Sequence, residues 1–137
     1  MVKINDSSFN EIMKHAEAGF PHEVCGVLIG LNHTITGYKE CNNLNTQRAH
    51  DRYELDPQSF KEADDLAREN GQEIIGIYHS HPDHPSMASE TDRQRAWPEW
   101  IYIIFSINEG KYNDSRAWIL EDSGSKFYEE PIEVTPD

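Results

Sequence analysis

Two histidines in the middle of the chain have the residue type and the spacing of metal ligands. His79 and His81 are two positions apart and follow directly on the apolar run at 74–78, which has the composition of a buried strand. Side chains alternate along a strand, so these two imidazoles are expected to point to the same face. Pro82 is expected to stop the strand, since proline cannot donate to a sheet ladder. The pair therefore predicts a metal site at a strand end.

Ser89 and Asp92 can complete such a site from a neighbouring helix. If a short helix begins near Ser86 or Ser89, Ser89 and Asp92 share one helix face because they are three positions apart. Two imidazoles and one carboxylate leave the fourth position of a zinc ion open for water, as catalytic zinc sites require. Zinc lowers the pKa of its water to about 7, and a carboxylate must then carry the proton to the leaving amine. The set predicts zinc-dependent hydrolysis, although the same ligands also suit iron or manganese.

These residues, together with Glu23, match the complete signature of a known family. From His79 the signature runs His-x-His, seven residues, Ser89, two residues and Asp92, and Glu23 matches its upstream acidic residue, just before an apolar run. The chain thereby resembles the JAB1/MPN/Mov34 (JAMM) metallopeptidases, in particular their small, single-domain prokaryotic type. The likeness extends from the first expected helix to about residue 107, and no position of the signature is substituted.

The resemblance implies a role for each of these residues. His79, His81 and Asp92 correspond to the ligands of one zinc ion per chain. Glu23 corresponds to the general acid/base that activates water, and Ser89 to the residue that stabilises the tetrahedral oxyanion. The catalytically inactive members of the family lose these ligands, so the intact set favours an enzyme.

The implied substrate is the tail of a ubiquitin-like or sulfur-carrier protein, hydrolysed at the peptide or isopeptide bond after its C-terminal Gly-Gly. Between Glu23 and His79 there are 55 residues, and between His81 and Asp92 there are 10. These distances leave no room for the large insertions with which eukaryotic deubiquitinases of the family select ubiquitin chains. A generalist or sulfur-carrier enzyme therefore fits better, with the tail bound in an extended form as an added strand beside a sheet edge.

Two other functions stay open, and several residues have simpler interpretations. A zinc amidase acting on a small molecule or a cell-wall peptide would use the same metal chemistry, whereas a non-enzymatic scaffold or binding module would use the fold alone.

Ser89 can also be the N-cap of a helix whose dipole favours Asp92. His84 in the Pro-rich loop can contact either substrate or solvent, and Trp97 belongs to the core or to the rim of the cleft. Cys25 is not expected to bind zinc, because a fourth protein ligand would close the site.

The elements that must position these residues can be read from periodicity and turn signals. Helices are expected over 9–18, from 57 to about 70, and briefly after residue 86 or 89. Strands are expected at 24–29, 34–40, 52–55, 73–79, 101–107, 115–121 and 126–134. This pattern predicts a single α+β or α/β-like domain over residues 1–137 with a mixed sheet. The resemblance further implies the MPN (cytidine deaminase-like) fold, a mostly antiparallel, curved sheet flanked by helices.

Composition narrows the class of partner. The net charge of -13 argues against binding to nucleic acid or to an anionic membrane surface, because both attract Lys and Arg. Hydrophobic residues at 36% and charged residues at 27% are typical of a soluble globular protein. No apolar run is as long as a membrane span, and residues 1–10 lack the blocks of a signal peptide, so a cytoplasmic location is expected. The two cysteines, Cys25 and Cys41, are expected to be reduced and buried. No sequence feature specifies an oligomeric state.

Overall fold

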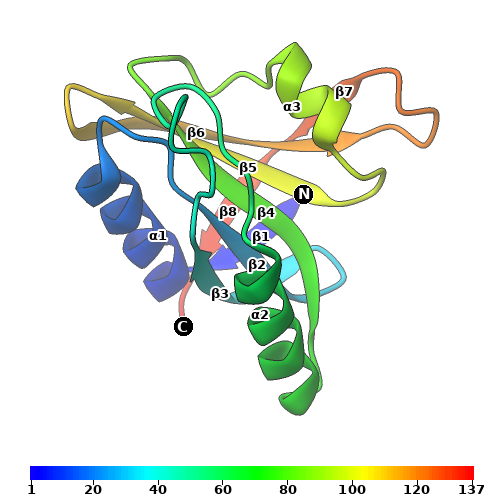
Figure 1. The fold of residues 1–137 in the computed structure, drawn as a ribbon. Helices are drawn as coiled ribbons and strands as arrows, with labels where there is room; N and C mark the ends of the chain where they lie inside the picture. The colour runs from blue at the N-terminus through cyan, green and yellow to red at the C-terminus, as the bar shows by residue number, and fades with distance from the viewer.

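One mixed sheet runs through the whole chain, in the strand order β7-β6-β5-β4-β2-β3-β1-β8 (Figure 1). The computed structural model describes residues 1–137. The strands are β1 (Val2–Asn5), β2 (Cys25–Leu31), β3 (Thr34–Cys41), β4 (Glu73–Pro82), β5 (Ile101–Asn108), β6 (Lys111–Leu120), β7 (Phe127–Glu130) and β8 (Ile132–Thr135). The helices are α1 (Asp6–Gly19), α2 (Pro57–Glu69) and α3 (Glu90–Arg95). Four of the seven strand pairs are antiparallel, which confirms the mixed, mostly antiparallel sheet.

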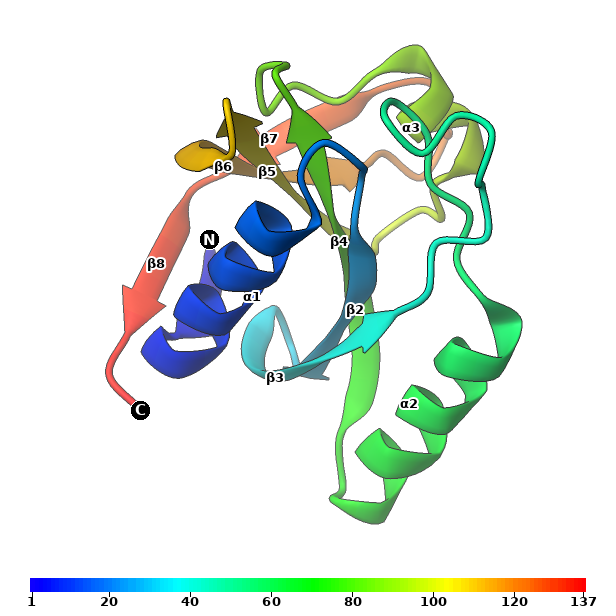
Figure 2. The ribbon, with the colours of Figure 1, turned by 60° about the vertical axis from the view of Figure 1, so that its left-hand side comes forward.

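The two long helices lie on opposite sides of β2 and β4 (Figure 2). Helix α1 packs Ile12 and Ala16 into the same cluster as Leu28 of β2, and α2 packs Ala63 into the cluster that contains Val27. Val27 and Leu28 are adjacent on β2, and adjacent side chains of a strand point to opposite faces. Both faces of β2 are therefore buried, which explains why its sequence is continuously apolar. The flanking helices confirm the expected α+β architecture.

The alternation of side chains on β4 decides where the two histidines of the motif point. Tyr78 lies in the cluster beneath α1, and its hydroxyl is 2.8 Å from Nδ1 of His15. Nε2 of His15 lies 3.3 Å from the carboxylate of Glu40, so the Tyr78 side chain is tied to α1 and, through it, to β3. His79 and His81 therefore point to the other face, at the end of a strand held between β2 and β5.

Two strand predictions differ from the structure. The strand expected at 73–79 continues to Pro82, because β4 pairs in parallel with β5 to its last residue. The strand expected at 52–55 is wrong, since only Leu55 pairs, as an isolated bridge to Asn43. The rest of that segment forms a loop that lies close to the two histidines.

Capping and turn residues determine where helix α2 and strand β6 begin. Helix α2 begins at Pro57, as predicted, and the Asp56 side chain caps it by accepting a backbone N–H at 3.2 Å. Strand β6 begins earlier than predicted, at Lys111. Glu109 and Gly110 have φ values of 51° and 86°, so two residues are enough to reverse the chain. No helix combines the length and the apolar character that crossing a bilayer requires.

The two ends of the chain depend on each other, and the sequence does not predict this. Strand β1, which was not predicted, pairs in parallel with both β3 and β8. The strand expected at 126–134 is divided at Pro131, so that β7 pairs with β6 while β8 crosses to β1. Pro131 has no N–H for the ladder, but its carbonyl accepts a hydrogen bond from the Val2 amide at 2.8 Å.

Candidate active site

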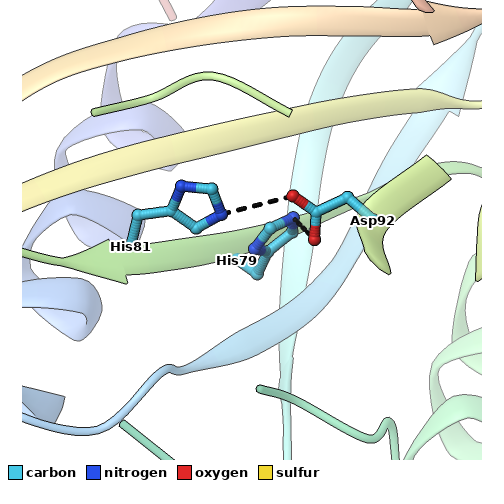
Figure 3. A group of neighbouring side chains, drawn as sticks. All are labelled: His79, His81 and Asp92. Carbon is cyan, nitrogen blue, oxygen red and sulfur yellow. Dashed lines mark ion pairs between the residues drawn. The ribbon is translucent and has the colours of Figure 1, made fainter. Parts of the chain in front are cut away.

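His79, His81 and Asp92 form one cluster, although they come from two separate elements (Figure 3). Each residue offers one ligand atom, and these atoms all lie within 4.8 Å of one another. Nε2 of His79 is 3.6 Å from Oδ1 of Asp92, and Nε2 of His81 is 3.3 Å from Oδ2. Strand β4 supplies both imidazoles and α3 supplies the carboxylate, so the three predicted ligands are brought together.

The hydrogen bonding of the two imidazoles fits a metal ion. Both ring nitrogens of His79 are buried without a hydrogen-bond partner, which is costly for a polar atom unless something else binds it. Nδ1 of His81 is 2.8 Å from the carbonyl oxygen of Pro85, and only an N–H on that nitrogen can donate to a carbonyl. The tautomer with the proton on Nδ1 leaves Nε2 of His81 free as a ligand atom facing Asp92. This donor set of two imidazoles and a carboxylate suits zinc.

The charges within the cluster oppose the effect of burial. Burial alone would raise the pKa of Asp92, but the adjacent imidazoles and the backbone N–H of Ser89 outweigh it and lower this pKa. Burial alone would lower the pKa of His79, but the carboxylates of Asp92 and Glu23 outweigh it and raise this pKa. Asp92 is therefore ionised at neutral pH, as a metal ligand must be.

Ser89 and Asp92 also cap α3. The Ser89 hydroxyl accepts a hydrogen bond from the Asp92 N–H at 3.0 Å, and Oδ2 of Asp92 accepts one from the Ser89 N–H at 2.8 Å. This reciprocal capping box confirms the helix-cap interpretation of the pair. It is compatible with a second use, because the cap occupies a lone pair of the Ser89 oxygen and leaves its O–H able to donate.

Glu23 is buried next to His79. Its side chain is only 5% exposed, and its Oε1 is 3.5 Å from Nδ1 of His79. Ser80, which lies between the two histidines and is fully buried, accepts a hydrogen bond from the Val24 N–H at 2.9 Å through its hydroxyl. The Ser80 N–H donates to the Val24 carbonyl at 3.1 Å. The sequence analysis did not identify the contact between Ser80 and Val24. The alternation of side chains along a strand does predict that Ser80 points to the face opposite to His79 and His81.

A pocket of about 470 Å³ opens onto the cluster. Glu23, His81, Ser89 and Asp92 line it, whereas His79 lies deeper. The remaining lining residues come from two loops and from α3: Asp51, Arg52, Tyr53, His84, Pro85, Met87, Ala88, Thr91 and Arg95. His84 is exposed on the wall of this pocket, where it can meet a ligand.

Cys25 is not part of the cluster. Its thiol lies 3.8 Å from the carbonyl oxygens of Cys41 and Asn42, and burial raises its pKa to about 12. Both cysteines are free and buried, as predicted. The Cys25 thiol therefore faces the Cys41 and Asn42 carbonyls and is not offered to the cluster of His79, His81 and Asp92.

The loop between β4 and α3 is fixed to the sheet by side chains that the sequence did not identify. The Ser86 hydroxyl donates to Asp114 of β6 at 2.7 Å, and the indole N–H of Trp118 donates to the Ser86 carbonyl at 2.9 Å. The Ser106 hydroxyl of β5 donates to the His84 carbonyl at 2.5 Å. These bonds hold the start of α3, and with it Asp92, against the end of β4.

Tyr53 is the main residue that sequence reasoning missed. Its ring stacks on the imidazole of His79, with centroids 4.6 Å apart and an interplanar angle of 26°. The segment 52–55 was interpreted as a strand, so nothing in the sequence connected this ring with the motif. The stacking limits rotation of the imidazole, which would suit a side chain that holds a metal ion.

Replacing the Tyr53 ring is expected to weaken metal binding. In Tyr53→Leu, His79 loses its flat support, and zinc affinity is expected to fall about tenfold, as for other groups that orient metal ligands. Tyr53→Phe keeps the stacked ring and serves as the matched control, with affinity unchanged. Competition with a chromogenic chelator measures both. Equal affinities for the Leu and Phe variants would contradict the orienting role.

An apolar groove of about 760 Å³ adjoins the pocket and shares Tyr53 and Arg95 with it. Its other lining residues are Glu54, Leu55, Pro57, Phe60, Ile77, Trp97 and Trp100. Trp97 is 64% exposed, so it belongs to the rim of the cleft and not to the core. Trp100 stacks on Phe60 of α2 with centroids 6.2 Å apart.

Comparison with known proteins links this geometry to one family. Residues 5–121 match the family described as prokaryotic homologs of the JAB domain. Desampylase from Haloferax volcanii is 34% identical over 132 residues, which cover 91% of this chain and 90% of that protein. CysO-cysteine peptidase from Mycobacterium tuberculosis is 26% identical over 133 residues, covering 91% and 85%. A JAB1/MPN domain protein from Archaeoglobus fulgidus has a similar structure, with a TM-score of 0.63 over 98% of this chain and 99% of that chain; at 18% identity this likeness shows the fold.

Proposed function

Because this chain belongs to the family of prokaryotic JAB-domain homologs and is a JAMM-type hydrolase, we propose that it hydrolyses the bond after the C-terminal Gly-Gly of a ubiquitin-like or sulfur-carrier protein. The observation that carries the proposal is the cluster of His79, His81 and Asp92 next to a pocket that Glu23 also lines. Relatives named desampylase and CysO-cysteine peptidase support a protein tail as the substrate.

The proposed metal ligands are His79, His81 and Asp92, which would hold one zinc ion per chain. When bound there, zinc would supply Lewis-acid chemistry, lowering the pKa of a water molecule and polarising the carbonyl of the scissile bond. The two unpartnered nitrogens of His79 and the free Nε2 of His81 support this assignment. The remaining steps can be assigned to side chains of the chain itself.

Glu23 is the proposed general acid/base. It takes a proton from the attacking water, whose oxygen bonds to the glycine carbonyl carbon, and it delivers that proton to the leaving nitrogen as the carbon–nitrogen bond breaks. The products are a free Gly-Gly carboxylate and an ammonium group, because the second proton of the water also ends on the leaving nitrogen. The O–H of Ser89 is proposed to donate to the carbonyl oxygen while negative charge develops on it. The position of Glu23 supports this role, because its side chain lies beside His79 and lines the same pocket.

Hydrolysis of a matched set of tails tests the proposal. The zinc-loaded chain is expected to release X from a ubiquitin-like protein that ends in Gly-Gly-X, measured by mass spectrometry. The same protein ending in Ala-Ala-X is the control and is expected to react much more slowly, because only a residue without a Cβ allows close approach of its backbone.

Two other outcomes would replace the proposal. If Gly-Gly-X tails are inert while small amides or cell-wall peptides are hydrolysed, the chain is a zinc amidase of another substrate class. If the zinc-loaded chain is inert toward all of them, it is a scaffold or binding module despite its intact motif.

A further inference from the structure

Two arginines line the proposed active-site pocket in a chain whose net charge is -13. We propose that Arg52 and Arg95, called the arginine pair below, bind the free carboxylate of the leaving residue. The preferred substrates are then tails extended by an amino acid with a free C-terminus, and isopeptides to lysine are poorer substrates. This inference rests on the proposed function and names the substrate class of the same site.

The helix that carries Asp92 also places Arg95 in the pocket. Asp92 and Arg95 are three positions apart on α3, so both side chains lie on one face of the helix, and both line the pocket. The guanidinium of Arg95 donates to the backbone carbonyl of Tyr53 at 2.6 Å, which fixes it to the loop on the opposite wall. Arg52 enters from that loop, immediately before Tyr53. The pair thus lines the same pocket as His81 and Asp92.

The guanidinium of Arg95 has no ion-pair partner in the chain. Arg68, Arg93 and Arg116 each form an ion pair with a carboxylate. Arg95 forms none, and its side chain binds only the neutral carbonyl of Tyr53. A guanidinium has five N–H donors, so most of those on Arg95 remain available to a ligand.

Arg52 shares a single carboxylate with another arginine. Arg48 binds both oxygens of Asp51, with Nε at 3.1 Å from Oδ1 and Nη2 against Oδ2. Nη1 of Arg52 is 3.6 Å from Oδ2, and its hydrogen bond goes to the Asp51 carbonyl at 2.9 Å. Asp51 is thus bound mainly by Arg48, which does not line the pocket, and the Arg52 guanidinium has only a long contact to this carboxylate.

These two guanidinium groups match the chemistry of one leaving group. In a Gly-Gly-X tail, the carboxylate of X lies within one residue of the scissile bond, a reach of about 3.6 Å. Guanidinium groups bind carboxylates through paired, charge-assisted hydrogen bonds. A lysine that leaves from an isopeptide presents only its ε-amine and a long apolar stem, because its own carboxyl is part of a peptide chain. The arginine pair therefore distinguishes the two types of bond.

Matched peptides test this inference in the zinc-loaded protein. The wild type is expected to hydrolyse Gly-Gly-X with a free carboxylate about tenfold faster in kcat/KM than the same peptide with a C-terminal amide. In Arg95→Gln the ratio of the two rates is expected to approach 1, and Arg95→Lys is expected to retain part of it. Arg93→Gln, on the same helix but outside the pocket, is the control and is expected to keep the wild-type ratio.

Two results would overturn the inference while leaving the proposed function intact. One is equal hydrolysis of the acid and the amide by the wild type, and the other is a wild-type ratio that persists in Arg95→Gln.

Isothermal titration calorimetry with zinc-loaded Glu23→Gln measures the binding of both peptides. It tests carboxylate recognition independently of hydrolysis. A Kd about tenfold lower for the acid supports carboxylate binding even if no tail is cut, and equal values refute it.

Discussion

The Glu23→Gln variant is expected to lose about 10²–10⁴-fold in kcat on a Gly-Gly-X tail, the range that a positioned general acid/base contributes. Glutamine has nearly the same shape as glutamate but cannot take up and release a proton at neutral pH. The Glu23 side chain is buried beside His79, so an isosteric change should leave the packing around the cluster of His79, His81 and Asp92 intact. Steady-state kinetics on the zinc-loaded variant measures the effect.

The zinc content of Glu23→Gln shows whether the loss of activity comes from the missing acid/base or from a missing metal ion. Glu23→Gln is expected to bind as much zinc as the wild type, because the three proposed ligands are unchanged. Glu54→Gln, an exposed acid near the pocket, is the matched control and is expected to keep full activity. If Glu23→Gln keeps wild-type kcat, the proton is carried by another group. If the variant loses zinc, Glu23 is needed for metal binding, and the loss of activity does not report on proton transfer.

Removing a proposed ligand is expected to abolish both zinc binding and hydrolysis. The wild type should contain about one zinc per chain, since two imidazoles and one carboxylate suffice for a catalytic site. His81→Ala and Asp92→Ala are expected to bind zinc more than 100-fold more weakly, beyond the roughly 10–100-fold loss typical of groups that only orient ligands. Elemental analysis and chelator competition measure this, and zinc should restore activity to chelator-treated wild type.

Two further variants separate ligand loss from damage to the fold. His84→Ala removes a pocket histidine that lies outside the cluster, and it is expected to keep its zinc. Asp92→Asn retains an oxygen that can still accept the Ser89 N–H of the capping box, so α3 should persist while the ligand charge is lost. Zinc retained by both His81→Ala and Asp92→Ala would refute the ligand assignment and leave the pair Ser89 and Asp92 as a helix cap.

What the sequence determined by itself is local. The common face of His79 and His81 follows from the two-residue period of a strand, and the common face of Ser89 and Asp92 follows from the period of a helix. Both periods are properties of the backbone, so a correct spacing is enough to predict them. The family resemblance brought Glu23 into the same site, and the structure places its carboxylate beside His79.

Only the tertiary structure decided which other side chains join these residues. Tyr53 and Arg52 belong to a loop without a periodic pattern, and the fold brings that loop onto β4 and α3. In the same way, β1 forms where the fold places residues 2–5 between β3 and, from the far end of the chain, β8. Contacts of this kind depend on packing between segments distant in sequence, and no spacing along the chain specifies them. The motif therefore predicted the metal chemistry, while the fold supplied the stacked ring and the arginines around the cluster.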